Sequence, residues 1–386
     1  MIQHIKASNL LSFGPDGLDL ELHDLNVLIG PNGSGKSNFL EIFELLKSLP
    51  RSEEDSNNLN AVISRGGGME EWICKIERAS AFRLQVVAGV EATFWEPTIE
   101  HSLTVSKHTL IYKEEIREIE DSGNVKFVLF LRDNDLLSFP NPSSKKLDDV
   151  NGLRLGGLSI LSRRSNGDVI GSLSLTYERI RLYREWSFGR NTIFRTPQRA
   201  DQRNDRLESD FSNLGMFLSR LRKDPSTKRA LVAALQELYD GITDFEVITE
   251  GGAIQIFFTE GDFSFPATRL SDGTLRYLCL IALLLDPTPP PLICIEEPEL
   301  GLHPDVLPQL ADLLVDASKR TQLIVTTHSD VLIDALSERP ESVLVCEKHE
   351  GQTQIKRLKR EDIAHWLTDY RLGQLWIRGE IGGTRW

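Results

Sequence analysis

The sequence has few cysteines, no long apolar run and no excess of basic residues. Its 386 residues include four cysteines, each within an apolar run and none in a CxxC spacing, so neither a disulfide framework nor a zinc site is expected. A reduced, cytoplasmic setting fits this usage. No apolar run reaches the roughly 18 residues that a membrane span needs, so no membrane association is expected. The net charge of -13 argues against a wholly basic nucleic-acid binder.

Against these absences stands one phosphate-binding motif. Residues 30–37 read Gly-Pro-Asn-Gly-Ser-Gly-Lys-Ser, which is the G-x-x-x-x-G-K-S pattern of a P-loop. The apolar run Leu25–Ile29 before it predicts a buried strand, and residues 38–48 after it have apolar side chains at helical spacing. The glycines therefore lie between a strand and a helix, where backbone N–H groups hold phosphate.

The P-loop pattern predicts roles for its residues in binding ATP. Lys36 is expected to reach the β- and γ-phosphates, and Ser37 is expected to ligate Mg²⁺. The other residues expected around the nucleotide are Gly30, Asn32, Gly33, Gly35 and Asn38.

Two carboxylates end a second apolar strand. Residues 292–297 read Leu-Ile-Cys-Ile-Glu-Glu, which is the Walker B pattern. Glu296 is expected to hold Mg²⁺ through water, and Glu297 is expected to orient and deprotonate the attacking water. The usual first acid is Asp, so Glu296 departs from the pattern by one methylene.

Two shorter motifs also offer phosphate contacts. In Leu-Ser-Asp-Gly-Thr (270–274), Ser271 is a good N-cap for a helix predicted at 272–285, and the helix N-terminus can face a phosphate. In Thr-Thr-His-Ser (326–329), His328 ends the next strand and can point at a γ-phosphate, because ligands bind at this edge of parallel sheets. Taken alone, each motif is also compatible with an ordinary cap or a packed histidine.

The order of these motifs, with Ile-Glu-Glu-Pro-Glu and Gly-Leu-His-Pro between them, resembles the ATP-binding-cassette (ABC) class of ATPases. It looks most like the soluble branch that contains RecF, SMC and OLD proteins. The resemblance covers roughly 1–80 and 265–346. It implies an α/β fold, namely an ABC-type P-loop ATPase head with an antiparallel β lobe and a small helical lobe. The 235 residues between Lys36 and Ser271 (271 minus 36) lack sustained heptads, so no coiled-coil arm is expected.

The resemblance also implies that ATP is hydrolysed by a homodimer. Ser271 and Gly273 of one subunit would close on the nucleotide held by Lys36 of the other. Gly301–Pro304 would be the D-loop across that interface, and His328 would be the switch histidine.

Other family elements are less complete. Phe13 is expected near the adenine, and no Q-loop glutamine can be assigned. Only 40 residues follow Cys346 (386 minus 346), too few for the TOPRIM nuclease domain of OLD proteins, so a stand-alone head is expected.

The chain is predicted to divide into 1–95 with the P-loop, 96–240 with the β-lobe extension and helical lobe, and 241–386 with the remaining motifs and a tail. Strands are expected at 2–9, 18–23, 25–29, 72–77, 82–90, 101–112, 125–131, 243–250, 253–259, 291–296, 321–327 and 342–346. Helices are expected at 38–48, 171–186, 210–223, 225–239, 272–285, 304–318 and 329–337. A charged turn is expected between 112 and 125, and a linker is expected at 140–151.

Two stretches are candidate partner surfaces. Between 179 and 206, eight arginines face three acids, a local charge of +5 (8 minus 3). These arginines are Arg179, Arg181, Arg184, Arg190, Arg195, Arg199, Arg203 and Arg206. They suit a nucleic-acid backbone or an acidic partner, and equally suit pairing with acids of the same fold. The tail Trp376–Trp386 suits a docking peptide or a segment folded back on its own head.

Three functions are compatible with this sequence. The first is a cytoplasmic ATPase that dimerises around Mg-ATP and controls a separate effector, such as a nuclease, in bacterial anti-phage defence. The second is a RecF-like DNA-repair ATPase that binds DNA directly. The third is an ATP-sensing scaffold with little turnover, and Glu297 argues against it because a sensor has little need for a base.

Overall fold

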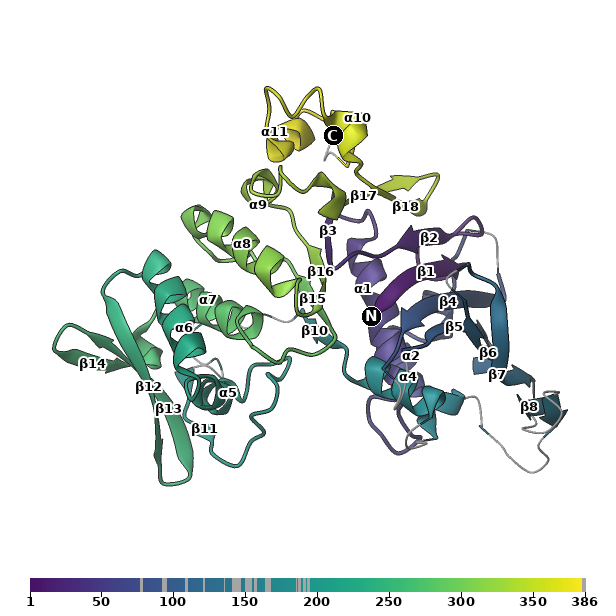
Figure 1. Ribbon diagram of the computed structural model, residues 1–386, viewed down its shortest axis with the longest axis horizontal. Coiled ribbons are helices and arrows are strands. Elements are labelled where there is room, and N and C mark those ends of the chain that lie inside the picture. The colour runs from purple at the N-terminus through teal and green to yellow at the C-terminus, as the bar shows by residue number, and fades with distance from the viewer. Residues whose placement is uncertain are drawn as a thin grey trace.

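A parallel sheet forms the centre of the computed structural model (Figure 1). The structure describes residues 1–76, 79–91, 96–107, 110–120, 122–134, 136–140, 147–149, 155, 158–163, 168–184, 186, 189, 192 and 195–383. The central sheet has the order β10-β15-β16-β3-β17-β18. Its strands are β10 (Arg181–Tyr183), β15 (Leu292–Glu296), β16 (Gln322–Thr326), β3 (Leu25–Ile29), β17 (Val343–His349) and β18 (Gln352–Arg357). All pair in parallel except β18, which is antiparallel to β17.

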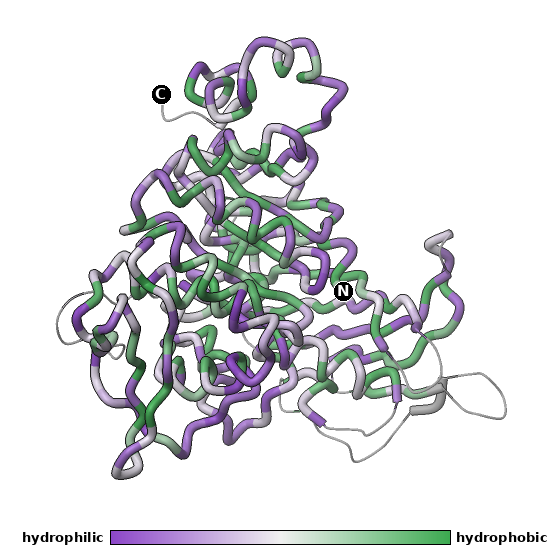
Figure 2. Tube along the Cα trace, turned by 60° about the vertical axis from the view of Figure 1, so that its left-hand side comes forward, coloured by the Kyte–Doolittle hydropathy of each residue, from purple (hydrophilic) through white to green (hydrophobic). Residues whose placement is uncertain are grey.

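This sheet separates two hydrophobic cores. Along β16, Leu323 and Val325 belong to one core and Ile324 belongs to the other, because successive side chains point to opposite faces. Both faces are covered, as parallel sheets require. Figure 2 shows hydrophobic residues gathered in the interior of the trace.

The first core lies between α1 (Lys36–Ser48) and an antiparallel β lobe. The lobe is one sheet in the order β2-β1-β4-β5-β6-β7-β8-β9. Its strands are β1 (Ile2–Ser8), β2 (Leu18–Glu21), β4 (Ala81–Gly89), β5 (Thr98–Ser106), β6 (Leu110–Ile119), β7 (Val125–Asp133), β8 (Leu136–Pro140) and β9 (Leu147–Asp149). Short helices beside it are α2 (Leu59–Arg65), α3 (Met69–Trp72), η1 (Ile160–Ser162) and α4 (Val169–Glu178). The expected antiparallel lobe is therefore confirmed.

The second core lies on the other face, under the helical lobe (Figure 1). Its helices are α5 (Leu214–Leu221), α6 (Pro225–Leu238), α7 (Asp272–Leu284), α8 (Leu307–Ala317) and α9 (Asp330–Asp334), with the short turns η3 (Ala267–Arg269), η4 (Pro304–Val306) and η5 (Pro340–Ser342). A small sheet packs beside them, made of β11 (Gln198–Arg199), β12 (Ile242–Glu250), β13 (Ala253–Glu260) and β14 (Phe263–Pro266). The longest helix in the described parts of the chain, α6, has 14 residues, so the lobe extends no coiled-coil arm.

Some predicted elements are wrong. Residues 113–119, expected in a turn, belong to β6, where inward positions include the buried Glu114, which pairs with His101 at 3.0 Å. Polar side chains at inward positions had hidden the alternation of hydrophobicity. The strand expected at 72–77 is instead the end of α3 and a turn, with a single β-bridge at Ile73. The helix expected at 171–186 ends at Glu178, before β10. Within the expected linker, β9 is a strand, and most of the rest lies outside the described residues.

The described part of the tail folds back on the head. Helix α10 (Arg360–Ile363) leads to α11 (Leu372–Ile377), which packs on α9 (Figure 1). Trp376 is 6% exposed, and its indole donates to the carbonyl of Gly383 at 2.7 Å. Trp376 is therefore no anchor for a partner, and Trp386 lies outside the described residues. No helix in the described ranges combines the length and apolarity needed to cross a bilayer.

Candidate nucleotide-binding site

The P-loop turns tightly between β3 and α1. Gly35 has φ 104°, a left-handed conformation that favours glycine, and directly precedes the first residue of α1. A Cβ on Gly35 would lie 2.1 Å from Oγ1 of the buried Thr353 on β18. The glycine therefore allows the loop to approach β18 and present the N-terminus of α1 at the edge of the sheet. Asn32 and Gly33 are exposed at the tip of the loop.

Lys36 lies inside the loop that it terminates. The residue is only 6% exposed. Its Nζ donates to the carbonyl oxygens of Gly30 at 2.8 Å and Pro31 at 3.0 Å. The ammonium is thus held where a phosphate on the loop would meet it.

The two expected Mg²⁺ ligands contact each other at the edge of the central sheet. Ser37 lies in the first turn of α1 and Glu296 ends β15, and Ser37 Oγ donates to Glu296 Oε1 at 2.5 Å. A hydroxyl and a carboxylate are hard oxygen ligands, which Mg²⁺ prefers together with phosphate oxygens and water. These residues therefore fit the metal, although no group of three or more His, Cys, Asp or Glu gathers in the described residues.

Arg184 holds the other oxygen of Glu296. Its Nε donates to Glu296 Oε2 at 2.8 Å, and its Nη1 donates to Glu41 Oε1 at 2.6 Å. Burial alone would lower the pKa of Arg184, but the hydrogen bonds to Glu296 and Glu41 and their charges raise it well above its ordinary value. The side chain therefore stays cationic between the two carboxylates.

The expected base and switch histidine also face each other. Glu297 Oε1 lies 3.3 Å from His328 Nε2. The backbone of Glu297 is left-handed, with φ 46°, and is held by hydrogen bonds at both its N–H and its carbonyl. Its N–H donates to the carbonyl of Thr326 at 3.0 Å, and its carbonyl accepts from Arg276 at 2.5 Å. A strained residue held from both sides is typical of a functional site.

Glu299 is a site residue to which the sequence motif alone gave no role. Its Oε1 accepts the N–H of His328 at 2.7 Å, so it fixes the loop that follows β16. Burial raises the pKa of this carboxyl, and hydrogen bonds from the His328 backbone and Thr327 oppose that rise. The signal in the sequence that could have identified Glu299 is that it is the third acid of Glu-Glu-Pro-Glu.

Two more residues of this site, Trp186 and Arg276, are not part of any predicted motif. The Trp186 indole donates to the carbonyl of Glu296 at 3.0 Å. The guanidinium carbon of Arg276 lies 4.0 Å from the centre of the Trp186 ring. These contacts brace the end of β15 from the helical lobe.

The expected signature residues lie beside the expected D-loop of the same chain. Ser271 caps α7, with its Oγ accepting the N–H of Thr274 at 3.0 Å, as predicted. A Cβ on Gly273 would lie 2.7 Å from the carbonyl oxygen of Gly301, so only glycine allows this approach. Helix α7 packs in the second core and α1 in the first, on opposite faces of the central sheet.

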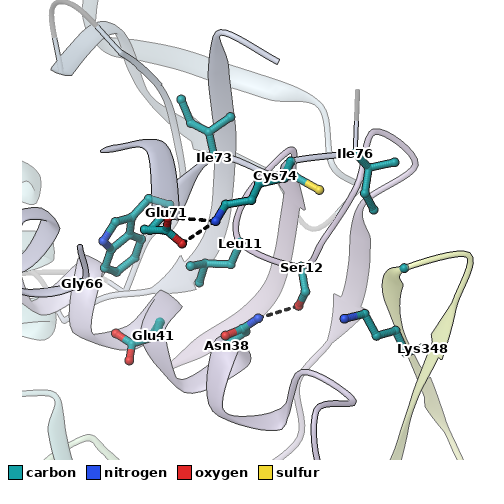
Figure 3. Close-up of a pocket in the computed structure, with 13 residues that line it drawn as sticks. Leu11, Ser12, Asn38, Glu41, Gly66, Glu71, Ile73, Cys74, Ile76 and Lys348 are labelled. Atoms are coloured by element: carbon teal, nitrogen blue, oxygen red, sulfur yellow. Dashed lines mark hydrogen bonds and ion pairs between the residues drawn. The ribbon is translucent and has the colours of Figure 1, made fainter. Parts of the chain in front are cut away.

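A pocket of about 440 Å³ opens beside the first turn of α1 (Figure 3). Ser12 and Asn38 line it and are joined by a 2.7 Å hydrogen bond from Asn38 Nδ2 to Ser12 Oγ. Ser37 contacts Glu296, while the next residue, Asn38, lines this pocket. Phe13, expected near the adenine, is completely buried in the first core and offers no face to a base.

Most of the arginines between 179 and 206 have partners within the fold. Arg195 pairs with Asp272, Arg199 with Asp201 and Arg203 with Asp205, at 2.5, 2.6 and 2.7 Å. Arg184 pairs with Glu41 and Glu296, and Arg181 is buried and donates to backbone carbonyls. Arg190 lies outside the described residues. The contacts favour pairing within the fold over a free basic surface.

Comparisons with known proteins bear on the family and the fold of this chain. A family model described as "AAA domain, putative AbiEii toxin, Type IV TA system" matches residues 25–334. A solved SMC head bound to the C-winged helix domain of ScpA is 16% identical, with a TM-score of 0.57 over 94% of this chain and 99% of that one. An SMC head with an extended coiled coil, bound to the C-terminal domain of ScpA from Pyrococcus furiosus, is 14% identical, with a TM-score of 0.54 over 95% and 98%. No curated protein matches. The structural likeness confirms the expected fold of an ABC-type head.

Proposed function

This chain belongs to the P-loop ATPase family described as "AAA domain, putative AbiEii toxin, Type IV TA system", and we propose that it hydrolyses ATP with Mg²⁺. One observation carries the proposal. The Ser37–Glu296 and Glu297–His328 pairs lie together where β3, β15 and β16 end. Substrates bind at this edge of parallel sheets.

Each residue then has a defined task. Lys36 and the N–H groups of the P-loop bind the triphosphate, and Ser37 and Glu296 hold Mg²⁺, which neutralises charge on the phosphate oxygens when bound. Glu297 orients a water molecule and accepts its proton as the water oxygen bonds to the γ-phosphorus. The bond from that phosphorus to the β–γ bridging oxygen breaks, and ADP and phosphate leave. His328 binds the γ-phosphate and steadies Glu297.

The nucleoside end of ATP would lie on the other side of the P-loop. Ser37 directs the phosphates and metal toward Glu296, so the ribose and base extend toward Asn38 and Ser12. The pocket in Figure 3 begins there and is large enough for a base.

Hydrolysis is proposed to need a homodimer. The signature residues Ser271 and Gly273 lie at the start of α7, on the face of the sheet opposite to α1. A second copy would place its own Ser271 and Gly273 over the nucleotide of the first.

The cycle is proposed to control a separate effector, such as a nuclease, in bacterial anti-phage defence. The support is the description of the family, which names a toxin–antitoxin system. Direct DNA binding in the manner of RecF has weaker support, because most of the described arginines between 179 and 206 are paired internally. An ATP-sensing scaffold with little turnover would leave Glu297 without a task.

Purified protein tests the proposal. We expect ATP hydrolysis that requires Mg²⁺, and a doubling of mass by light scattering when ATP is added. Hydrolysis absent with the effector present would refute the enzymatic function. DNA binding that weakens steeply with salt and needs no partner would favour the RecF-like alternative.

A further inference from the structure

Arg184 lies beside the proposed metal site, although it belongs to no predicted motif. The residue directly follows β10, the edge strand that pairs in parallel with β15. Tyr183 lies opposite Ile295 in this pairing, so the next residue, Arg184, lies beside Glu296. The sheet topology therefore places a cation beside the Walker B carboxylate.

The guanidinium of Arg184 fixes the orientation of that carboxylate. It binds Oε2 of Glu296 at 2.8 Å, while Ser37 occupies Oε1 at 2.5 Å. Charge-assisted hydrogen bonds of this length are among the stronger polar contacts in proteins. Because Oε2 is occupied by Arg184, the oxygen presented beside Ser37 is Oε1.

Glu41 anchors the guanidinium from a third element. Glu41 lies four residues after Ser37 on α1 and accepts from Arg184 Nη1 at 2.6 Å. Arg184 is thus held between the helix that carries Ser37 and the strand that carries Glu296. Both Arg184 and Glu41 also line an open cleft of about 640 Å³, so solvent ions have access to this region.

A glutamate at this position requires more conformational restraint than an aspartate would. Glu296 has one more rotatable bond than the usual Asp, so its carboxylate can adopt more orientations. Confining that extra torsion costs conformational entropy when a metal binds, unless the protein has confined it already. The Arg184 contact supplies this confinement.

We propose that Arg184 is a positioning residue for Mg²⁺, which holds Glu296 so that a single oxygen stays available beside Ser37. The inference rests on the proposed function, because it assumes that these residues bind Mg-ATP. Arg184 contacts neither metal nor phosphate in this role. It acts only through the Glu296 carboxylate.

The test measures how much Mg²⁺ is needed to bind nucleotide, without using hydrolysis. Binding of a fluorescent ATP analogue to the full chain is titrated with Mg²⁺ and repeated in EDTA. In Arg184→Gln we expect the half-saturating Mg²⁺ concentration to rise by about 10- to 100-fold, as for other partners of metal ligands, while binding in EDTA is unchanged. Arg184→Lys, which keeps the charge but not the two-sided geometry, should show a smaller rise.

Two further variants keep the test sharp. Glu41→Gln removes the anchor of the guanidinium but leaves the Glu296 contact, so a rise smaller than that of Arg184→Gln is expected. Arg199→Gln is the matched control, because Arg199 is exposed and pairs with Asp201 within the same arginine-rich stretch. It should behave as the wild type.

The outcomes separate the inference from the proposed function. An unchanged Mg²⁺ requirement in folded Arg184→Gln would overturn the inference, with folding checked by thermal unfolding. An equal loss of binding in EDTA would also overturn it, because Arg184 would then contact the phosphates. If Arg184→Gln does not fold, unchanged Mg²⁺ requirements in both Arg184→Lys and Glu41→Gln would decide against it. A wild type that binds no nucleotide would refute the proposed function itself.

Discussion

Replacing Glu297 by Gln removes the proposed base and leaves its surroundings in place. The hydrogen bonds that hold this residue use its backbone N–H and carbonyl, which the substitution keeps. The side chain is 28% exposed and of the same size as glutamine, so the free energy of unfolding should change by no more than about 0.5 kcal/mol. The substitution therefore removes the base and the negative charge that faces His328, and it leaves the backbone contacts in place.

The expected loss follows from the task of the residue. A positioned general base contributes about 10²- to 10⁴-fold to a rate, which corresponds to roughly 3–5.5 kcal/mol in the barrier. ATP binding should be retained, because the proposed binding uses Lys36, Ser37 and Glu296, and the substitution leaves these three residues unchanged. The variant should then remain in the ATP-bound dimer.

Three measurements on one preparation check this reasoning. Phosphate release gives the rate, a fluorescent nucleotide gives the affinity, and light scattering gives the mass with ATP. Glu246→Gln is the matched control, since it makes the same change at an exposed side chain on β12, away from the proposed site. Hydrolysis by Glu297→Gln at the wild-type rate would refute the assignment of the base, whereas loss of ATP binding would mean that Glu297 helps hold the nucleotide.

The remaining predictions concern the P-loop and the tail. Lys36→Ala should weaken ATP binding by at least about tenfold, because it loses charged contacts to phosphate; equilibrium binding measures this. Gly33→Ala, with φ 79° and no atom in the way, should lower the free energy of unfolding by about 1–2 kcal/mol in denaturant titrations. Gly35→Ala adds a clash with a buried hydroxyl and should cost about 2–5 kcal/mol; equal effects would contradict the geometry. Trp376→Ala should cost about 3–5 kcal/mol in the same assay, and an unchanged stability would mean that the tail is not packed on the head.

The sequence predicts best those parts of the site that are formed by residues adjacent in the chain. The P-loop lies between an apolar run and a stretch with helical spacing, and both features are visible within residues 25–48. The structure confirms the strand and the helix that they predict. The same holds for the cap at Ser271 and the strand that ends at Glu296. The prediction missed strand β6 because Glu114 and Glu118 occupy inward positions. Hydrophobic residues at alternate positions are the local signal of a strand, and these two glutamates interrupt it.

The arginine-rich stretch shows why the rest could not be predicted. Counting charges between 179 and 206 gives the local excess but not the position of its partners. In the fold, Arg195 meets Asp272 across 77 residues, and Arg184 meets Glu296 across 112 and Glu41 across 143. The two Arg184 pairs exist because β10 adds to the sheet beside β15, a topological choice that no window of sequence contains. A run of like charges is therefore evidence for an external partner only after the fold has been searched for internal ones, and here that search turns one apparent DNA contact into a proposed determinant of metal binding.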